Sequence, residues 1–178
     1  MPEVRTRRAD LGTLDLQIAP DWEAVKAVWD TCREVLARAG LNDDETYQLA
    51  MVARELLENA VKFGAFAEGE RIQLAIRAAA EEVVVEVKSR VGVDDAHLRR
   101  FDQAIQRIRG FQYPFEAFVE RMKIVSAQPS SDGETGIGLT RIAYEGRSII
   151  DFYLDEDDLL AVSAVYRRDV PGGVWRTP

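Results

Sequence analysis

The chain has 178 residues, 47% of them hydrophobic, which is one domain's worth of sequence with enough apolar side chains for a sizeable core. Its formal net charge of −8 argues against general nucleic-acid binding, because neutralising phosphates requires a basic surface. No apolar run is long enough to span a bilayer, the N-terminus has no hydrophobic signal segment, and Cys32 is the only cysteine. We therefore expect a cytoplasmic protein without disulfides.

The first part of the chain predicts a strand followed by two helices. Residues 14–18 alternate between apolar and polar side chains, which is typical of a strand. Residues 22–36 carry an apolar stripe at helical spacing, and Cys32 lies inside that stripe, so we interpret it as a core residue and not a nucleophile. Asn42 is placed to cap a second helix, and Gly64 is placed to end it.

The second helix carries polar residues in an unusual arrangement. Glu55, Asn59 and Lys62 fall at i, i+4 and i+7, so their side chains share one face beside the buried stripe. Asparagine is a poor residue for a helix interior unless its amide is occupied. A carboxylate one turn before an amide carbonyl supplies oxygen ligands suited to Mg²⁺ or to a positioned water. The alternative is an amphipathic helix that carries Glu55 and Asn59 on its solvated side.

The sequence Glu55-(x)3-Asn59-Ala60-x-Lys62 late in a helix resembles the N-box of the histidine-kinase-like ATPase superfamily (GHKL). The branch it resembles most is the small anti-sigma-factor serine kinases of partner-switching regulators. The resemblance implies that Asn59 holds the Mg²⁺ that bridges the nucleotide phosphates. It also implies that Glu55 is the general base or orients the attacking group, and that Lys62 belongs to the nucleotide-binding residues.

Two strands are predicted next, at residues 72–76 and 83–87. In active members of the superfamily the second of these runs into an Asp-x-Gly-x-Gly box, whose aspartate accepts the adenine amino group. Here Ser89 or Arg90 stands where the aspartate should be, and only Gly92 of the glycines is present. No residue can therefore be assigned as the adenine anchor, and we expect ATP binding to be weakened or lost.

A helical insertion is predicted at about residues 94–125, in two amphipathic helices. ATP-binding relatives have a mobile lid in this interval, whereas the aromatic stripes here favour fixed structure or a docking surface. His97 is the only histidine of the chain, and we interpret it as a solvated surface residue and not a phospho-acceptor. No second histidine or thiolate is available to build a transition-metal site with it.

A polar loop at residues 126–135 precedes Gly136-Ile137-Gly138-Leu139, which opens a helix. Glycines there expose backbone N–H groups, and the helix dipole favours an anion such as phosphate. A Gly-x-Gly alone is also compatible with tight loop–helix packing. Coming after the Glu55 and Asn59 helix, this segment resembles the superfamily's Gly-x-Gly-Leu box, with Gly136, Gly138 and Leu139 matching. Two final strands, at 148–154 and 160–166, flank an acidic hairpin turn.

The resemblance covers roughly residues 14–167 and two of three diagnostic boxes, and residues 1–178 are expected to form one domain. It implies an α/β (α+β) two-layer sandwich, in which a mixed β-sheet carries the two long helices and the glycine-box helix on one face.

The function implied is a bacterial partner-switching regulator with a degenerate ATP site, acting by binding a sigma factor or a STAS-type anti-sigma antagonist. The alternative is an active ATP- and Mg²⁺-dependent serine/threonine kinase that phosphorylates an anti-sigma-antagonist-like partner. The ATPase module of a sensor histidine kinase is disfavoured, because the chain has no dimerisation-and-phosphoacceptor helix pair. Small relatives often dimerise, so the resemblance also implies a homodimer.

Overall fold

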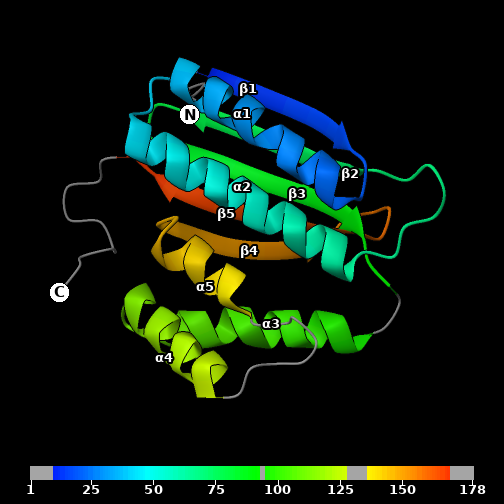
Figure 1. The fold of residues 1–178 in the computed structure, drawn as a ribbon, viewed down its shortest axis with the longest axis vertical. Coiled ribbons are helices and arrows are strands. Elements are labelled where there is room, and N and C mark those ends of the chain that lie inside the picture. Colours follow the sequence, from blue (N-terminus) through cyan, green and yellow to red (C-terminus); the bar gives the residue numbers. More distant parts are fainter. Residues whose placement is uncertain (1–9, 93–94, 128–135, 169–178) are drawn as a thin grey trace, which may run out of the picture.

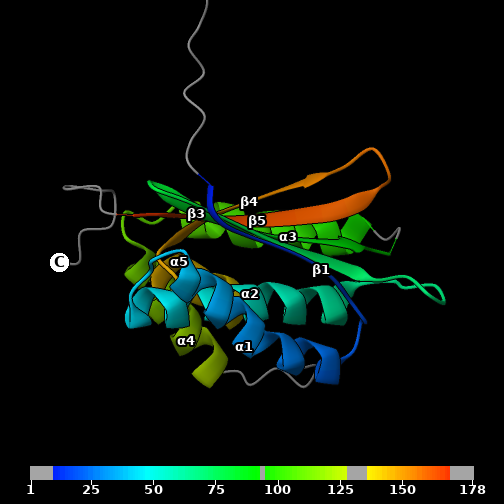
Figure 2. The ribbon, with the colours of Figure 1, turned by 90° about the horizontal axis from the view of Figure 1, so that it is seen from above.

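A five-stranded sheet forms one layer of the protein, and helices α1, α2 and α5 lie on one of its faces (Figures 1 and 2). The structure is a computed structural model that describes residues 10–92, 95–127 and 136–168. The strands are β1 (Asp10–Ile18), β2 (Ile72–Ala79), β3 (Glu82–Arg90), β4 (Ser148–Leu154) and β5 (Leu159–Arg167). The helices are α1 (Trp22–Arg38), α2 (Asp43–Phe63), α3 (Asp95–Arg109), α4 (Pro114–Ala127) and α5 (Ile137–Tyr144). The predicted α+β sandwich and the positions of its strands are confirmed.

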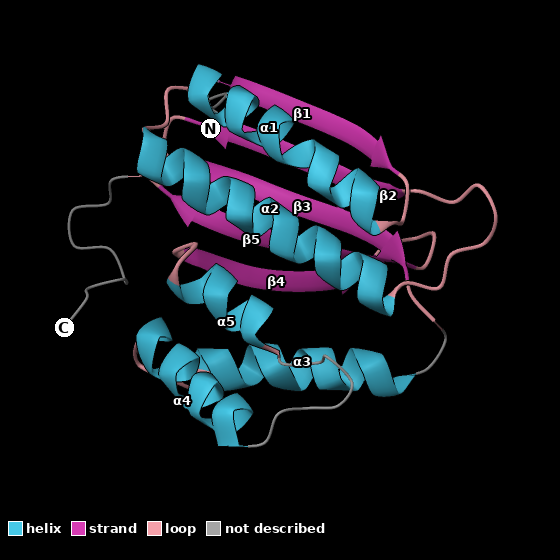
Figure 3. Cartoon of the chain, viewed as in Figure 1, coloured by secondary structure: helices cyan, strands magenta, loops and turns pink. Residues whose placement is uncertain are grey.

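The sheet differs from the prediction in one respect, because its strands are all antiparallel and not mixed. The strand order is β1-β2-β3-β5-β4, and each neighbouring pair runs antiparallel. The chain leaves β1, passes along two antiparallel helices and therefore returns in the opposite direction at β2. Strands β3 and β4 do run in the same direction, but β5 lies between them, so no parallel neighbours arise (Figure 3).

The two long helices begin and end where their capping residues predict. The Asp21 side chain accepts a hydrogen bond from the N–H of Ala24 at 2.8 Å and caps α1. Asn42 and Glu45 form a reciprocal capping box at the start of α2. At the other end of α2, the N–H of Gly64 donates to the carbonyl oxygen of Ala60 at 2.9 Å.

The core lies between these helices and the sheet. Helix α2 contributes nine buried residues: Thr46, Leu49, Ala50, Met51, Val52, Ala53, Leu56, Leu57 and Ala60. From α1, Cys32 is only 1% exposed, and burial raises the pKa of its thiol to about 12. A thiol that stays protonated is a poor nucleophile, so the interpretation of Cys32 as a core residue is confirmed.

Helices α3 and α4 confirm the prediction of two helices after β3. Helix α3 lies along the edge strand β4 (Figure 1), where Arg109 donates to the carbonyl oxygen of Ile150 at 2.9 Å. Helix α4 packs on α5, with the Phe115 ring 5.2 Å from that of Tyr144. Helix α4 reaches Ala127, two residues into the segment predicted as a loop; the rest of that loop and the His97 side chain lie outside the described residues. No described helix is long and apolar enough to cross a membrane.

Candidate functional site

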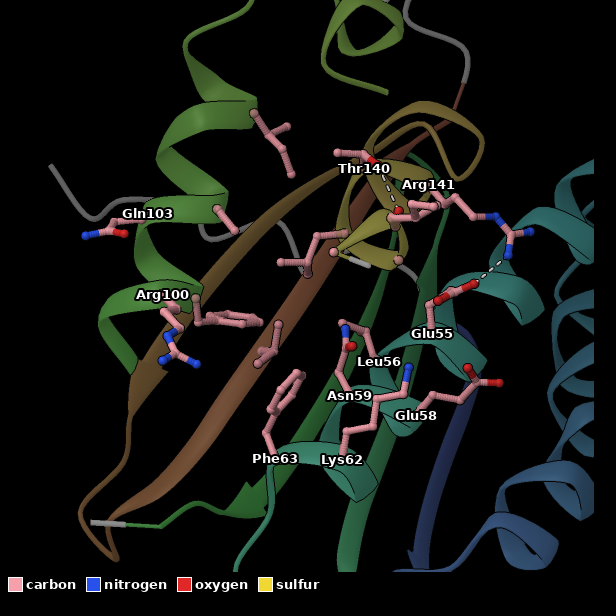
Figure 4. A pocket seen from close by; sticks show the side chains of 18 of the residues that line it. Glu55, Leu56, Glu58, Asn59, Lys62, Phe63, Arg100, Gln103, Thr140 and Arg141 are labelled. Atoms are coloured by element: carbon pink, nitrogen blue, oxygen red, sulfur yellow. Dashed lines mark hydrogen bonds and ion pairs between the residues drawn. The ribbon is translucent and has the colours of Figure 1, made fainter. Parts of the chain in front are cut away.

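A cavity of about 530 Å³ opens between α2, α5 and the α3–α4 pair (Figure 4). The last residues of β3 and the first residues of β5 form part of its wall. This volume lies in the range of small-molecule and cofactor sites, roughly 300–1,000 Å³. All six residues singled out from the sequence line it: Glu55, Asn59, Lys62, Gly136, Gly138 and Leu139. The folded chain thus brings the two predicted boxes, which lie far apart in sequence, to one place.

Glu55 is held at the α2–α5 contact by an arginine. Arg141, on α5, donates through Nη1 to Glu55 Oε1 at 2.6 Å, and Figure 4 shows its side chain reaching towards the carboxylate. The side chain of Glu55 is 15% exposed. Burial raises the pKa of this carboxyl more than the neighbouring Arg141 lowers it, so the net pKa is above the ordinary glutamate value.

Asn59 has an orphaned donor. Its side-chain nitrogen Nδ2 is buried and makes no hydrogen bond within the described part of the chain. Buried polar atoms of this kind are uncommon in proteins and often mark the place of a water, ion or ligand. Lys62, one turn later, is exposed at the rim, with Nζ 6.0 Å from the ring centroid of Trp22.

The glycines of the second box allow α5 to approach α2 closely. A Cβ atom placed on Gly138 would lie 2.6 Å from Glu55 Oε2 and 3.9 Å from Asn59 Nδ2. Gly136 adopts a left-handed conformation, with φ of 62°, directly before the first turn of α5. Leu139, which is 6% exposed, packs into the core and anchors that turn. The first turn of α5 therefore faces the polar residues of α2 without an intervening side chain.

The structure resolves which of Ser89 and Arg90 faces the cavity. Side chains alternate along β3, so the buried Ser89 lines the cavity whereas Arg90 points away and pairs with Glu70 at 2.5 Å. Of the two residues considered for the position of the family's aspartate, the one that lines the cavity is therefore Ser89, with a hydroxyl.

Sequence reasoning did not find the arginines of this site. Besides Arg141, the cavity lining includes Arg100 and Arg107 from α3 and Arg121 from α4. Gly138 and Arg141 are spaced i, i+3, a signal that Arg141 faces the same way as the glycine. Nothing local to the sequence indicates that α3 and α4 close the cavity, because that depends on tertiary packing.

The metal-ligating capacity of the site is modest. Among the described residues, no cluster of three His, Cys, Asp or Glu side chains could hold a metal ion. Mg²⁺ bound with a nucleotide needs little from the protein, since it keeps several waters and takes the phosphates plus one or two protein oxygens. The unpartnered atom of Asn59 is the donor Nδ2, which suits a phosphate oxygen, whereas a single protein ligand for Mg²⁺ would have to be the side-chain oxygen Oδ1 of the same amide.

Comparison with known families agrees with this geometry. The sequence model of the histidine kinase-like ATPase domain matches residues 18–143, a span that starts at the end of β1 and ends in α5. The chain belongs to the histidine kinase-like ATPase family. The family match includes both boxes that line the cavity, and the superfamily resemblance predicted from Glu55, Asn59 and the glycine box is confirmed.

A solved structure shows the same fold. A chain of the SiaB–SiaC complex from Pseudomonas aeruginosa superposes with a TM-score of 0.65 at 19% sequence identity. The alignment covers 92% of this chain and 94% of that chain, so the ATPase-type fold extends over nearly the whole length of both. No curated protein sequence matches the chain.

Proposed function

We propose that the chain is a partner-switching regulator that binds a nucleotide with Mg²⁺ in the α2–α5 cavity. Depending on the bound nucleotide, it transfers phosphate to a protein partner or releases that partner. The observation that carries this proposal is the convergence of six predicted residues on one cavity of suitable size. A chain that had lost its nucleotide site would have no chemical reason to keep Glu55, the orphaned Asn59 amide and the open Gly138 contact together.

The phosphate end of the site consists of the first turn of α5 and the polar face of α2. Backbone N–H groups at a helix N-terminus attract anions, and the first turn of α5, which begins between Gly136 and Gly138, lines this cavity. Asn59 offers Nδ2 as a donor to a phosphate oxygen and Oδ1 as a ligand for Mg²⁺. Bound Mg²⁺ would neutralise part of the phosphate charge. A neutral amide can serve as its protein ligand in place of a carboxylate.

Glu55 is the residue placed to act on an attacking group. In transfer to a serine or threonine of the partner, its carboxylate would take the hydroxyl proton as the hydroxyl oxygen bonds to the γ-phosphorus. The bond from that phosphorus to the bridging oxygen then breaks, and the α5 amides stabilise the charge on the transferring group. The Arg141 contact supports this proposed role, because it fixes Oε1 of Glu55 beside α5.

The base end of the cavity is less well equipped. Ser89 replaces the expected carboxylate, so the adenine amino group would lose a charge-assisted acceptor. Losing one such hydrogen bond weakens binding by roughly 1–3 kcal/mol, or about ten- to hundredfold, without abolishing it. We therefore expect ATP affinity to come mainly from the phosphates.

The partner surface we favour is α4. Two of its apolar side chains, Phe115 and Met122, lie seven positions apart on one side of the helix and are each 41% exposed. Exposed apolar residues gathered on one helix are typical of protein–protein contacts. The similar fold in a solved two-protein complex supports a protein partner, and a sigma factor or STAS-type antagonist remains the partner class we propose. The homodimer and the cytoplasmic location remain predictions.

A second candidate function has an observation in its favour. If Ser89 marks a site that no longer binds nucleotide, the protein regulates by binding its partner alone, and its affinity for the partner is independent of nucleotide. Partner affinity would then respond to substitutions on the exposed face of α3 and α4 and not to substitutions in the cavity.

Calorimetric titration with Mg-ATP separates the two candidates. We expect the wild-type protein and Gln106→Ala, an exposed amide on α3 that does not line the cavity, to bind with equal affinity. Asn59→Ala should lose Mg²⁺-dependent binding while keeping a cooperative thermal unfolding transition. Equal binding by all three proteins would show that Asn59 does not bind the nucleotide. If none of them binds nucleotide at millimolar concentration, the protein is a regulator that acts by partner binding alone.

A further inference from the structure

We propose that Arg141, itself oriented by Glu145, is a positioning residue that fixes the Glu55 carboxylate so that Oε2 faces the first turn of α5. This inference rests on the proposed function of Glu55 as the group that acts on the attacking hydroxyl. It adds a relay of three side chains that links the glycine-box helix to α2 and that the family resemblance does not contain.

The relay is defined by the way the guanidinium group is shared. Arg141 Nε and Nη2 each lie 3.1 Å from Oε2 of Glu145, the C-cap residue of α5, four positions later. This leaves Nη1 to donate to Glu55 Oε1 at 2.6 Å across the α2–α5 contact. A planar guanidinium held on two of its nitrogens presents the third in a fixed direction, which a flexible ammonium does not do. Glu145 thus orients the Arg141 guanidinium, and Arg141 orients the Glu55 carboxylate.

The two oxygens of Glu55 consequently have different environments. Oε1 accepts from Arg141, whereas Oε2 accepts no hydrogen bond from the described residues and lies where a Cβ of residue 138 would be, at 2.6 Å. Gly138 therefore provides the room that Oε2 occupies. The free oxygen lies beside the turn whose amides would bind phosphate, so the arrangement presents a single acceptor to an incoming hydroxyl or water.

The charges that face Glu55 single out Arg141 as its partner. From α2, Arg54, Glu58 and Lys62 act on it, but Arg54 pairs with Glu58 at 2.7 Å. Arg141, from α5, is the largest of the electrostatic influences that favour the ionised carboxylate, and it opposes the effect of burial. A carboxylate in this setting would otherwise gain a proton more readily and lose its capacity to accept one.

A purely structural ion pair is the competing explanation. The Arg141 and Glu55 side chains are 35% and 15% exposed, and a pair at that depth could simply join α5 to α2. A structural role predicts a change in stability only. A positioning role predicts a change in the protonation of Glu55 and in kcat, with partial rescue by Arg141→Lys, since the ammonium supplies the charge without the fork.

The experiment compares Arg141→Gln, Arg141→Lys and Glu145→Gln with Arg38→Gln, which removes an exposed i, i+4 pair with Glu34 on α1. The carboxyl carbon of Glu55 is followed by NMR through a pH titration of the nucleotide-free protein. We expect the pKa of Glu55 to rise by about one unit or more in Arg141→Gln, by less in Glu145→Gln and Arg141→Lys, and not in Arg38→Gln. An unchanged pKa in Arg141→Gln would overturn the relay.

Steady-state turnover of Mg-ATP provides the second readout. In Arg141→Gln we expect kcat to fall about ten- to hundredfold with KM little changed, because positioning acts on the reacting group and not on the bound phosphates. A rise in KM at constant kcat would instead make Arg141 a ligand-binding residue and contradict the proposal. If the wild-type protein binds no nucleotide, the proposed function fails, while the NMR titration still decides whether Arg141 controls Glu55.

Discussion

The two walls of the cavity are built very differently. Helix α2 has nine buried residues and forms part of the main core, whereas among the side chains that the structure describes only Ala117 is buried in α4 and only Ile105 in α3. The polar groups on α2 are therefore fixed by the folding of the whole domain. The α3–α4 wall is tied down by few buried contacts, and such elements open at low free energy. We therefore expect α2 to form a rigid wall beside the phosphates, and the α3–α4 wall opposite it to change conformation when a ligand or partner binds.

The largest effect should come from truncating the rigid wall. Leu57→Ala, at a side chain that is 1% exposed, should reduce the free energy of unfolding by about 2–5 kcal/mol, because it removes buried methyl groups and leaves a cavity. Met122→Ala, on α4 and 41% exposed, should change it by no more than about 0.5 kcal/mol. Urea denaturation measures both. Equal losses from the two substitutions would show that α4 belongs to the core as much as α2 does.

A smaller effect should separate binding from folding at the glycine contact. Gly138→Ala directs a methyl group at Glu55 Oε2, a terminal side-chain atom and not backbone, so the carboxylate is displaced from the position that Arg141 holds while the fold tolerates the change. Alanine also suits a helix better than glycine by roughly 0.5–1 kcal/mol. We expect unaltered or slightly higher thermal stability together with Mg-ATP affinity reduced at least about tenfold, measured by calorimetry.

The matched control is Gly146→Ala. Its added methyl group would lie 2.6 Å from the backbone carbonyl oxygen of Ile142 and 2.3 Å from a methyl of the buried Val52, neither of which can move cheaply. This variant should lose stability outright. If Gly138→Ala lost stability to the same extent, the α5 contact would be structural and its link to binding would be unsupported.

The smallest effect concerns the pH dependence of stability. The folded protein raises the pKa of Glu55 above its unfolded value, mainly through burial, so the native state binds its proton more readily than the unfolded state does. The stability associated with this proton is present at acid pH and is lost as pH rises through the folded pKa. Glu55→Gln should therefore stabilise the protein near neutral pH and do so less at acid pH, as thermal melts at several pH values would show. A gain in stability that does not depend on pH would contradict the raised pKa of Glu55 as its cause.

Much of the rigid wall was predictable from local sequence. The apolar period of α2, the Asn42 capping box and Gly64 as the C-cap each depend on residues within a few positions of one another. The glycine box was also recognisable, because a turn before a helix is a local feature. The position of Glu55 and Asn59 on one face beside the buried stripe of α2 followed from helical geometry alone.

The remaining features depend on long-range packing. Arg141 and Glu55 are 86 residues apart, and no local pattern indicates that their side chains meet. The choice between Ser89 and Arg90 required the register of β3, since a shift of one residue reverses which side chain faces the cavity. The all-antiparallel sheet required the position of β5 between β3 and β4, which strand patterns do not specify.

Hydrogen–deuterium exchange of the wild-type protein, with and without Mg-ATP, tests the account most directly. We expect the amides of α2 to be protected in both states, because that wall is part of the core. Amides in α3, α4 and the first turn of α5 should exchange more slowly when Mg-ATP is present, and ATP with EDTA should have a weaker effect. Identical exchange of α3, α4 and α5 with and without millimolar Mg-ATP would contradict a nucleotide site between the two walls.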